Sequence, residues 1–232
     1  MTKGLSSGQK QIKKNLKTNF MLGDVLLINE KHQLAGGKII EHILTCLKPK
    51  MIIGISGESG SGKSELAHVI AKGMRKHGIF AKPLHIDNYY RILPLLRTEW
   101  RKENGIQNVV GYGEYDWNTI YRNIAEFQKG LLSTGPCVDL VTEQVDQLTT
   151  DYSTVDMLVV DGLYAIKTEG IDLSIFIELT YHETKKAQVV RGKEPQNEYR
   201  MAVLEQEHQM VQALRPKADI LINKDYEVVM AK

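Results

Sequence analysis

One glycine-rich run has residue types and spacing suited to holding a chain of phosphates. Residues 57–64 have the sequence GESGSGKS and match the pattern G-x-x-x-x-G-K-[ST] in full. Glycines let the backbone turn tightly and point several N–H groups at one anion, and the N-terminus of a following helix adds partial positive charge. A glycine-rich turn with a chance lysine is disfavoured, because an apolar run precedes the motif and a helical pattern follows it. We expect a nucleoside triphosphate to bind through Gly57, Ser59, Gly60, Ser61, Gly62, Lys63 and Ser64.

A magnesium ion is expected beside these phosphates. Lys63 can reach the β- and γ-phosphates, and the Ser64 hydroxyl offers the oxygen that a hard cation prefers. A second oxygen ligand is expected at the end of a core strand, where the apolar run 158–160 is followed by Asp161. Asp161 would hold Mg²⁺ directly or through a water. The alternative is an ordinary aspartate in the turn that leaves a strand.

A phosphate motif alone does not distinguish a kinase from a GTPase or a motor. A kinase also needs a group that takes or orients the proton of the attacking hydroxyl, and such a group is expected at the end of the second strand. Residues 85–90 (HIDNYY) follow the apolar part of that strand, and ligands bind at the carboxyl ends of strands in parallel sheets. Asp87 is the candidate general base for an attacking hydroxyl, and Tyr90 would pack on or bond to the acceptor. An Asx turn after the strand is the alternative for Asp87. His85 is expected to pack rather than to catalyse.

A basic stretch after the strand at 173–179 is a candidate lid over the phosphates. It contains Lys185, Lys186, Arg191 and Lys193, and Gly192 and Pro195 interrupt the helical pattern there. Arg191 is the first choice for a catalytic phosphate contact that neutralises charge during transfer. A solvated basic helix face is an equally weighted alternative.

The elements that must position these residues alternate between strands and helices. Strands are expected at 51–56, 79–86, 137–145, 155–160, 173–179 and 218–223, and helices at about fifteen residues from 62 and at 117–129, 183–191 and 197–214. Residues 91–115 look irregular. This alternation predicts an α/β protein with the three-layer P-loop NTPase fold and a mostly parallel central sheet.

The first fifty residues differ from the rest. We expect residues 1–50 to form an N-terminal extension, with a basic tail that lacks acids in its first twenty residues and a short helix in the second half of 33–47. Residues 51–232 would form the kinase-like domain. In the tail, Ile12, Leu16 and Phe20 recur every four residues, which fits a short amphipathic helix on a partner subunit; a solvated tail is favoured over it.

The bulk composition excludes several classes of protein. The 232 residues carry a net charge of only +2, too small to indicate nucleic acid, and no apolar run approaches the length of a membrane helix. The N-terminus lacks a signal-peptide pattern, so a cytoplasmic protein with reduced cysteines is expected. No pattern reports the oligomeric state, although symmetric homo-oligomers are common enough to be a fair expectation.

Together, these pieces resemble the uridine kinase and phosphoribulokinase family of P-loop kinases. The resemblance spans about residues 51–223 and rests on IGISGESGSGKS at 53–64, DNYY at 87–90, VVDGLYAI at 159–166, DLSIFIEL at 172–179 and ADILI at 218–222. By this resemblance Asp87 is the base, Tyr90 lines the acceptor pocket, Asp161 belongs to the magnesium shell and Arg191 to the lid. It also implies ATP, Mg²⁺ and a small-molecule acceptor with a sugar-type hydroxyl.

The sequence departs from uridine kinases in the segments that contact the pyrimidine. A glutamate is usual where this chain has Asp161, and the Phe-Asp-His-Pro and Tyr-Asp-Phe segments are replaced by VGYGEYDW at 110–117 and VDLV at 138–141. Tyr112, Tyr115 and Asp116 could line an acceptor pocket, or they could form a loop and a helix cap, with Asp116 as the cap.

These observations lead to an expected activity and its alternatives. We expect a kinase that transfers the γ-phosphoryl group of ATP to a hydroxyl, with a nucleoside such as uridine or cytidine as the acceptor. The alternatives are a kinase of phosphoribulose, pantothenate or adenylylsulfate, and a regulatory nucleotide-binding protein with little acceptor chemistry.

Overall fold

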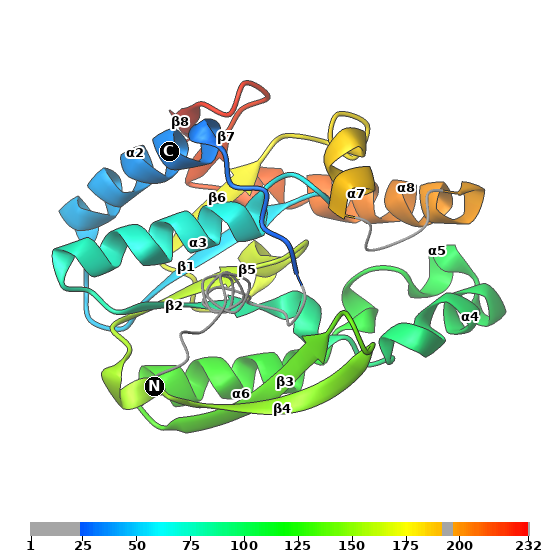
Figure 1. Ribbon diagram of the computed structural model, residues 1–232, viewed down its shortest axis with the longest axis horizontal. Helices are drawn as coiled ribbons and strands as arrows, with labels where there is room; N and C mark the ends of the chain where they lie inside the picture. Colours follow the sequence, from blue (N-terminus) through cyan, green and yellow to red (C-terminus); the bar gives the residue numbers. More distant parts are fainter. Residues whose placement is uncertain (1–23, 192–196, 232) are drawn as a thin grey trace, which may run out of the picture.

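The central sheet is built around a strand that is buried along its whole length. In the computed structural model, which describes residues 24–191 and 197–231, β1 (Met51–Gly57) lies between β5 (Met157–Asp161) and β6 (Leu173–Ile177). The other strands of this sheet are β2 (Ala81–His85), β7 (Ile220–Ile222) and β8 (Val228–Met230). Their order among the described residues is β2-β5-β1-β6-β7-β8, and all neighbouring pairs are parallel except β7 with β8 (Figure 1).

The register of this sheet decides which side chains meet at its carboxyl edge. Ile55 of β1 and His85 of β2 are both paired with Asp161 at the end of β5. The polar residues that follow these strands therefore emerge side by side. The predicted α/β fold with a mostly parallel central sheet is confirmed.

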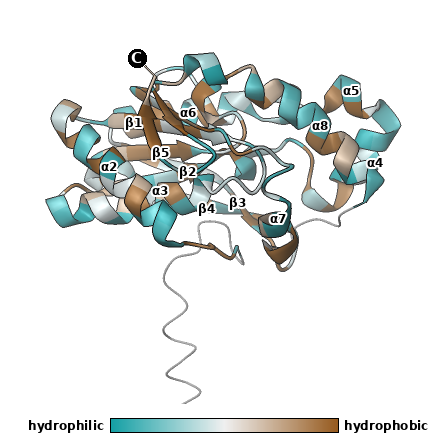
Figure 2. Ribbon diagram, turned by 90° about the horizontal axis from the view of Figure 1, so that it is seen from above, coloured by the Kyte–Doolittle hydropathy of each residue, from teal (hydrophilic) through white to brown (hydrophobic). Residues whose placement is uncertain are grey.

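Helices cover both faces of the sheet and make three layers. One face packs on α2 (Glu30–Cys46) and α3 (Lys63–Met74), and the other packs on α6 (Trp117–Gln128) and on the end of α8 (Glu198–Gln212). The remaining helices are α4 (Pro94–Asn104), α5 (Ile106–Val109) and α7 (Lys185–Arg191). Figure 2 shows mainly hydrophobic central strands and helices that mix both kinds of residue, as expected for helices with one buried face. In the described part of the chain, no helix is long and apolar enough to cross a membrane.

A separate hairpin lies beside α6. It consists of β3 (Leu132–Asp139) and β4 (Gln144–Asp151), paired antiparallel from Leu132↔Asp151 to Asp139↔Gln144 (Figure 1). The predicted single strand at 137–145 was wrong, because the turn of this hairpin lies inside that range. Most side chains of β4 are exposed, so the segment lacks the apolar run that marks a core strand.

Two further expectations about local structure need correction. Residues 91–115, predicted to be irregular, contain α4 and α5; Arg101 is the one buried residue of α4, so this helix carries no apolar stripe to reveal it. The sequence also gave no sign of β8, which has only three residues. The first twenty residues, for which a solvated tail was favoured over a short helix, lie outside the described part of the chain.

Helix α2 precedes β1 and is tightly packed against α3. Ala35, Ile39 and Ile43 are buried in the same core cluster as α3 and the sheet. Two glycines allow the close approach: a Cβ added to Gly36 would lie 2.4 Å from Val69 Cγ1, and one added to Gly73 would lie 2.3 Å from Ile40 Cδ1. Helix α2, which was predicted to belong to an N-terminal extension, is thus part of the same hydrophobic core as the sheet.

We expect Gly36→Ala to destabilise the protein by about 1–3 kcal/mol, because the stiff β-branched side chain of Val69 cannot move away from the new methyl group. Gly37→Ala is the matched control, since a Cβ there has nothing within 4 Å. It should stabilise the helix by about 0.5–1 kcal/mol. Urea unfolding measures both, and equal effects of the two substitutions would show that α2 is not packed in this way.

Candidate active site

The glycine-rich loop folds back on itself between β1 and α3. Gly60 and Gly62 have φ angles of 77° and 95°, in the left-handed region that favours glycine, and Ser61 N donates to Glu58 O at 3.2 Å. Lys63 is buried, and its Nζ donates to Glu58 O at 2.7 Å. The loop, the lysine and the N-terminus of α3 thus lie together in the structure, and helix N-termini and successive backbone N–H groups are features that bind anions.

Three polar side chains meet where the first turn of α3 reaches the ends of β2 and β5. Ser64 Oγ donates to Asp161 Oδ2 at 2.9 Å, and His85 Nδ1 lies 2.5 Å from Asp161 Oδ1. Asp161 and His85 are both buried. A hydroxyl and a carboxylate beside a phosphate loop are the ligands that Mg²⁺ takes when phosphates and waters supply the rest. Among the described residues, no three acidic, histidine or cysteine side chains form a group that could hold a metal ion.

Asp87 lies next to the same edge of the sheet. It belongs to a short 3-10 helix, η2 (Ile86–Tyr89), and its Oδ1 would be 3.2 Å from a Cβ added to Gly162, the residue after Asp161. Tyr115 Oη is 3.5 Å from Asp87 Oδ1 and donates to Tyr90 Oη at 2.8 Å. Burial, and then nearby negative charge, raises the pKa of Tyr90, while burial raises the pKa of Tyr115. Both phenols therefore keep their protons and can act as donors near the carboxylate.

A pocket of about 730 Å³ opens beside these tyrosines and contains several predicted substrate residues. Tyr90, Tyr115 and Asp116 line it, together with Arg91 and Arg122. Tyr112 does not line this pocket, because its hydroxyl donates to Met210 O and its ring packs edge-on against Tyr164.

Asp116 also caps a helix. Its Oδ1 accepts from Thr119 N at 3.2 Å and its Oδ2 from Thr119 Oγ1 at 2.6 Å, so the carboxylate stabilises the first turn of α6. The hydrogen bond from the Thr119 side chain is the main reason that the pKa of Asp116 is lowered. The helix-cap alternative is thus observed, and the cap still faces the pocket.

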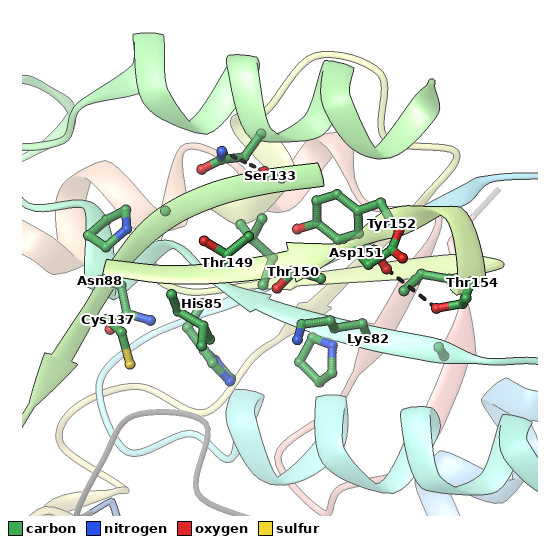
Figure 3. Close-up of a pocket in the computed structure, with 18 of the residues that line it drawn as sticks. Lys82, His85, Asn88, Ser133, Cys137, Thr149, Thr150, Asp151, Tyr152 and Thr154 are labelled. Carbon is green, nitrogen blue, oxygen red and sulfur yellow. Dashed lines mark hydrogen bonds between the residues drawn. The ribbon is translucent and has the colours of Figure 1, made fainter. Parts of the chain in front are cut away.

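A second cavity of about 550 Å³ lies on the other side of η2, between β2 and the hairpin (Figure 3). His85 and Asn88 line it, as do Lys82 and Cys137, while Asp87 lines neither this cavity nor the pocket of about 730 Å³. Asn88 Oδ1 accepts from Val138 N at 3.0 Å and attaches the hairpin to η2. Tyr89, at the end of η2, lines both cavities.

Three residues of α8 that the sequence did not single out contact the phosphate loop: Arg200, His208 and Gln212. Glu58 Oε1 accepts from Gln212 Nε2 at 2.5 Å and lies 2.8 Å from His208 Nδ1, while its Oε2 accepts from Tyr181 N at 2.7 Å. Arg200 Nη2 is 3.4 Å from Ser59 Oγ. Nothing local in the sequence distinguishes Arg200 from other helix arginines. Arg191 ends α7, and its side chain lies outside what the structure describes.

A chain of buried charges joins the phosphate loop to the turn before the pocket of about 730 Å³. Arg101 makes two hydrogen bonds to Glu114, at 2.7 and 3.0 Å. Glu207 of α8 lies 3.9 Å from the Arg101 guanidinium and 3.5 Å from the Arg200 guanidinium. Because Arg200 reaches Ser59, the two halves of the site share one charged network through α8.

Comparison with known proteins identifies a family that matches most of the chain. A model of the family described as phosphoribulokinase / uridine kinase matches residues 52–212. A uridine kinase of Staphylococcus aureus is 25% identical over 193 residues, which cover 76% of this chain and 88% of that protein.

Several solved structures share the fold. A possible uridine kinase from Bacillus stearothermophilus aligns with a TM-score of 0.61 and 18% identity, over 82% of this chain and 97% of that chain. The phosphoribulokinase from Rhodobacter spheroides aligns with a TM-score of 0.58 and 14% identity, over 75% of this chain and 70% of that chain. A D-glycerate 3-kinase from Cryptococcus neoformans aligns with a TM-score of 0.56 and 12% identity, over 86% of this chain and 97% of that chain. These structural matches establish the fold, and they span proteins named for different acceptors.

We expect Arg101→Met to destabilise the protein by about 3–5 kcal/mol, because it removes the cation that makes two hydrogen bonds to the buried carboxylate of Glu114 and one of the two cations that face Glu207. Adding Glu114→Gln should restore part of the loss. Lys102→Ala is the control: this neighbour pairs with Glu99 on the surface, and its removal should leave the unfolding midpoint unchanged. Similar urea midpoints for Arg101→Met and Lys102→Ala would contradict the network.

Proposed function

The chain belongs to the phosphoribulokinase/uridine kinase family, and on that premise we propose that it transfers the γ-phosphoryl group of ATP to a nucleoside hydroxyl, with uridine or cytidine as acceptor. The observation that carries this proposal is the placement of Asp87: its carboxylate lies beside Gly162, one residue from Asp161 and across the sheet edge from the phosphate loop. A proton acceptor at that point suits the attack of a hydroxyl on a phosphate held by the loop.

Each residue has a role in this proposal. The backbone of Gly57–Ser64 binds the phosphates, and Lys63 leaves Glu58 O to bind the terminal ones. Ser64 and Asp161 would hold Mg²⁺, which neutralises phosphate charge when bound. Asp87 accepts the proton of the acceptor hydroxyl, while Arg191 and Arg200 stabilise the negative charge that develops during transfer.

The acceptor pocket supports a nucleoside through its aromatic residues. Tyr90 and Tyr115 lie with ring centroids 4.3 Å apart, and Trp117 lies 5.9 Å from Tyr115. Tyr90 and Trp117 are partly exposed and can pack on a planar base, and the Asp116 carboxylate can accept hydrogen bonds from ribose hydroxyls. The uridine kinases among the relatives support the same class of acceptor.

One observation favours a second candidate, an acceptor that carries negative charge. Arg91 and Arg122 both line the pocket, and the Arg97 guanidinium lies 3.6 Å from the centroid of the Tyr90 ring. Phosphoribulose, pantothenate and adenylylsulfate are all anions that these arginines could bind.

A panel of acceptors tests the proposal. With Mg²⁺ and ATP, uridine or cytidine should raise ADP formation at least tenfold above the rate without acceptor, and Asp87→Asn should lower that stimulated rate by about 10²–10⁴. The same variant should bind ATP as tightly as the wild type, because Asp87 has no place in the phosphate loop. Lys63→Ala is the counterpart and should lose ATP binding itself.

Other outcomes of the panel are equally informative. Stimulation by phosphoribulose, pantothenate or adenylylsulfate instead of a nucleoside would establish the anionic alternative. If ATP binds and no acceptor accelerates turnover, the regulatory nucleotide-binding alternative gains support. Full activity of Asp87→Asn would exclude Asp87 as the base.

His85 has a separate and measurable role in this proposal, as a positioning residue for Asp161. Asn can place an amide N–H near the position of His Nδ1, so His85→Asn should keep the Mg²⁺ concentration for half-maximal activity near the wild-type value. His85→Leu should raise that concentration by about 10–100-fold, as expected when a neighbour that orients a ligand is lost. Activity titrations with Mg²⁺ at saturating ATP measure both, and an unchanged Mg²⁺ requirement of His85→Leu would rule the role out.

A further inference from the structure

The segment before β1 reaches the nucleotide loop. Leu27 N donates to Glu65 Oε1 at 3.1 Å, and Glu65 lies in the buried first turn of α3. Helix α2 then begins at Glu30 and runs along α3. Residues 24–46 therefore begin beside the first turn of α3, the helix that follows the glycine-rich loop.

His32 carries this contact to the loop itself. It sits in the first turn of α2, where Asn29 N donates to His32 Nδ1 at 3.1 Å and His32 N donates to Asn29 Oδ1 at 3.3 Å. Burial lowers the pKa of His32, so the ring is neutral and Nδ1 can accept this bond. The other nitrogen, Nε2, would be only 2.5 Å from a Cβ added to Gly62.

Tyr226 reaches the same glycine from the other end of the chain. It lies between β7 and β8, and its hydroxyl donates to Gly62 O at 3.3 Å. The same hydroxyl would lie 2.5 Å from the added Cβ of Gly62, and the rings of Tyr226 and His32 meet edge to face with centroids 4.8 Å apart. The rings of His32 and Tyr226 thus contact each other, and both lie close to Gly62 of the loop.

Gly62 is the position at which support of this kind matters. It is the N-cap of α3, its φ of 95° is in the left-handed region, and no side chain caps the helix there. The directions of the N–H groups that follow it depend on this backbone conformation. N–H donors that are already aligned bind an anion more tightly, because binding then costs no conformational entropy for ordering the loop.

We propose that residues 24–46 brace the nucleotide loop and that His32 and Tyr226 are positioning residues, which hold Gly62 in its phosphate-binding conformation. This inference rests on the proposed function only in requiring that the loop bind a nucleotide. It assigns a binding role to a segment that precedes the P-loop domain in the sequence. The expected signature is weaker ATP affinity with an unchanged acceptor KM.

Two substitutions in α2 separate this role from stability. His32→Gln keeps an acceptor for Asn29 N, since Gln is a normal capping-box residue at that position, but it removes the ring that contacts Gly62. Ile43→Ala is the converse: Ile43 is fully buried near the other end of α2 and belongs to the core cluster, so its truncation lowers stability without touching the loop.

Titration calorimetry of Mg-ATP binding, with thermal unfolding of the free proteins, tests the proposal. His32→Gln should bind Mg-ATP about 5–10-fold more weakly with a similar melting temperature, and Tyr226→Phe about fivefold more weakly through the lost hydrogen bond. Ile43→Ala should melt at a lower temperature and bind Mg-ATP within twofold of the wild type.

Three results would overturn the brace: wild-type affinity in both His32→Gln and Tyr226→Phe, an equal loss of affinity in Ile43→Ala, or a raised acceptor KM with unchanged ATP affinity. A wild-type protein that binds no Mg-ATP would instead refute the proposed function, and the brace with it. Tyr226→Phe keeps the ring and changes one atom, so it provides a result even if a His32 variant folds poorly.

Discussion

The parallel pairing of β5 with β1 on one side and β2 on the other determines where the polar residues of this protein can meet. Because Ile55 and His85 are both in register with Asp161, the loop after β1, the carboxylate after β5 and the segment after β2 leave the sheet at one edge. A shift of β5 by one residue would turn Asp161 to the other face. The hydrogen bond between Ser64 and Asp161 then ties the first turn of α3 to this edge.

Buried electrostatics extend this arrangement beyond the sheet. Glu58 is bonded to the backbone of Tyr181 and to Gln212 on α8, while Arg200 on the same helix reaches Ser59. Through Glu207 and Arg101, α8 is also joined to Glu114, in the turn just before the pocket lined by Tyr90 and Tyr115. Buried charges of this kind are costly to separate, so the glycine-rich loop and this pocket are held in a fixed relation.

The parts of the structure that follow from local sequence were predictable, and those that depend on distant partners were not. The loop at 57–64 and Asp161 are marked by short patterns, and β1 and β5 are marked by uninterrupted apolar runs. Helix α4 and strand β4 were missed because their side chains are mostly exposed and show no apolar period. The pairing of His85 with Asp161 depends on sheet register, and the contact of Arg200 with Ser59 spans 141 positions. Asp116 could be a cap or a pocket residue from sequence, and only the position of Thr119 showed that it caps.

The meeting of His32 and Tyr226 at Gly62 also has a consequence for how the protein is made. Contacts between such distant positions give the loop a high contact order, and contacts of that kind form late because a long stretch of chain must be closed first. During synthesis, a chain that has left the ribosome only as far as β6 already contains the complete glycine-rich motif. It does not yet contain the tyrosine that completes the support of Gly62. A nucleotide would therefore bind unfinished chains more weakly than finished ones, so that its binding would stabilise the finished molecules more.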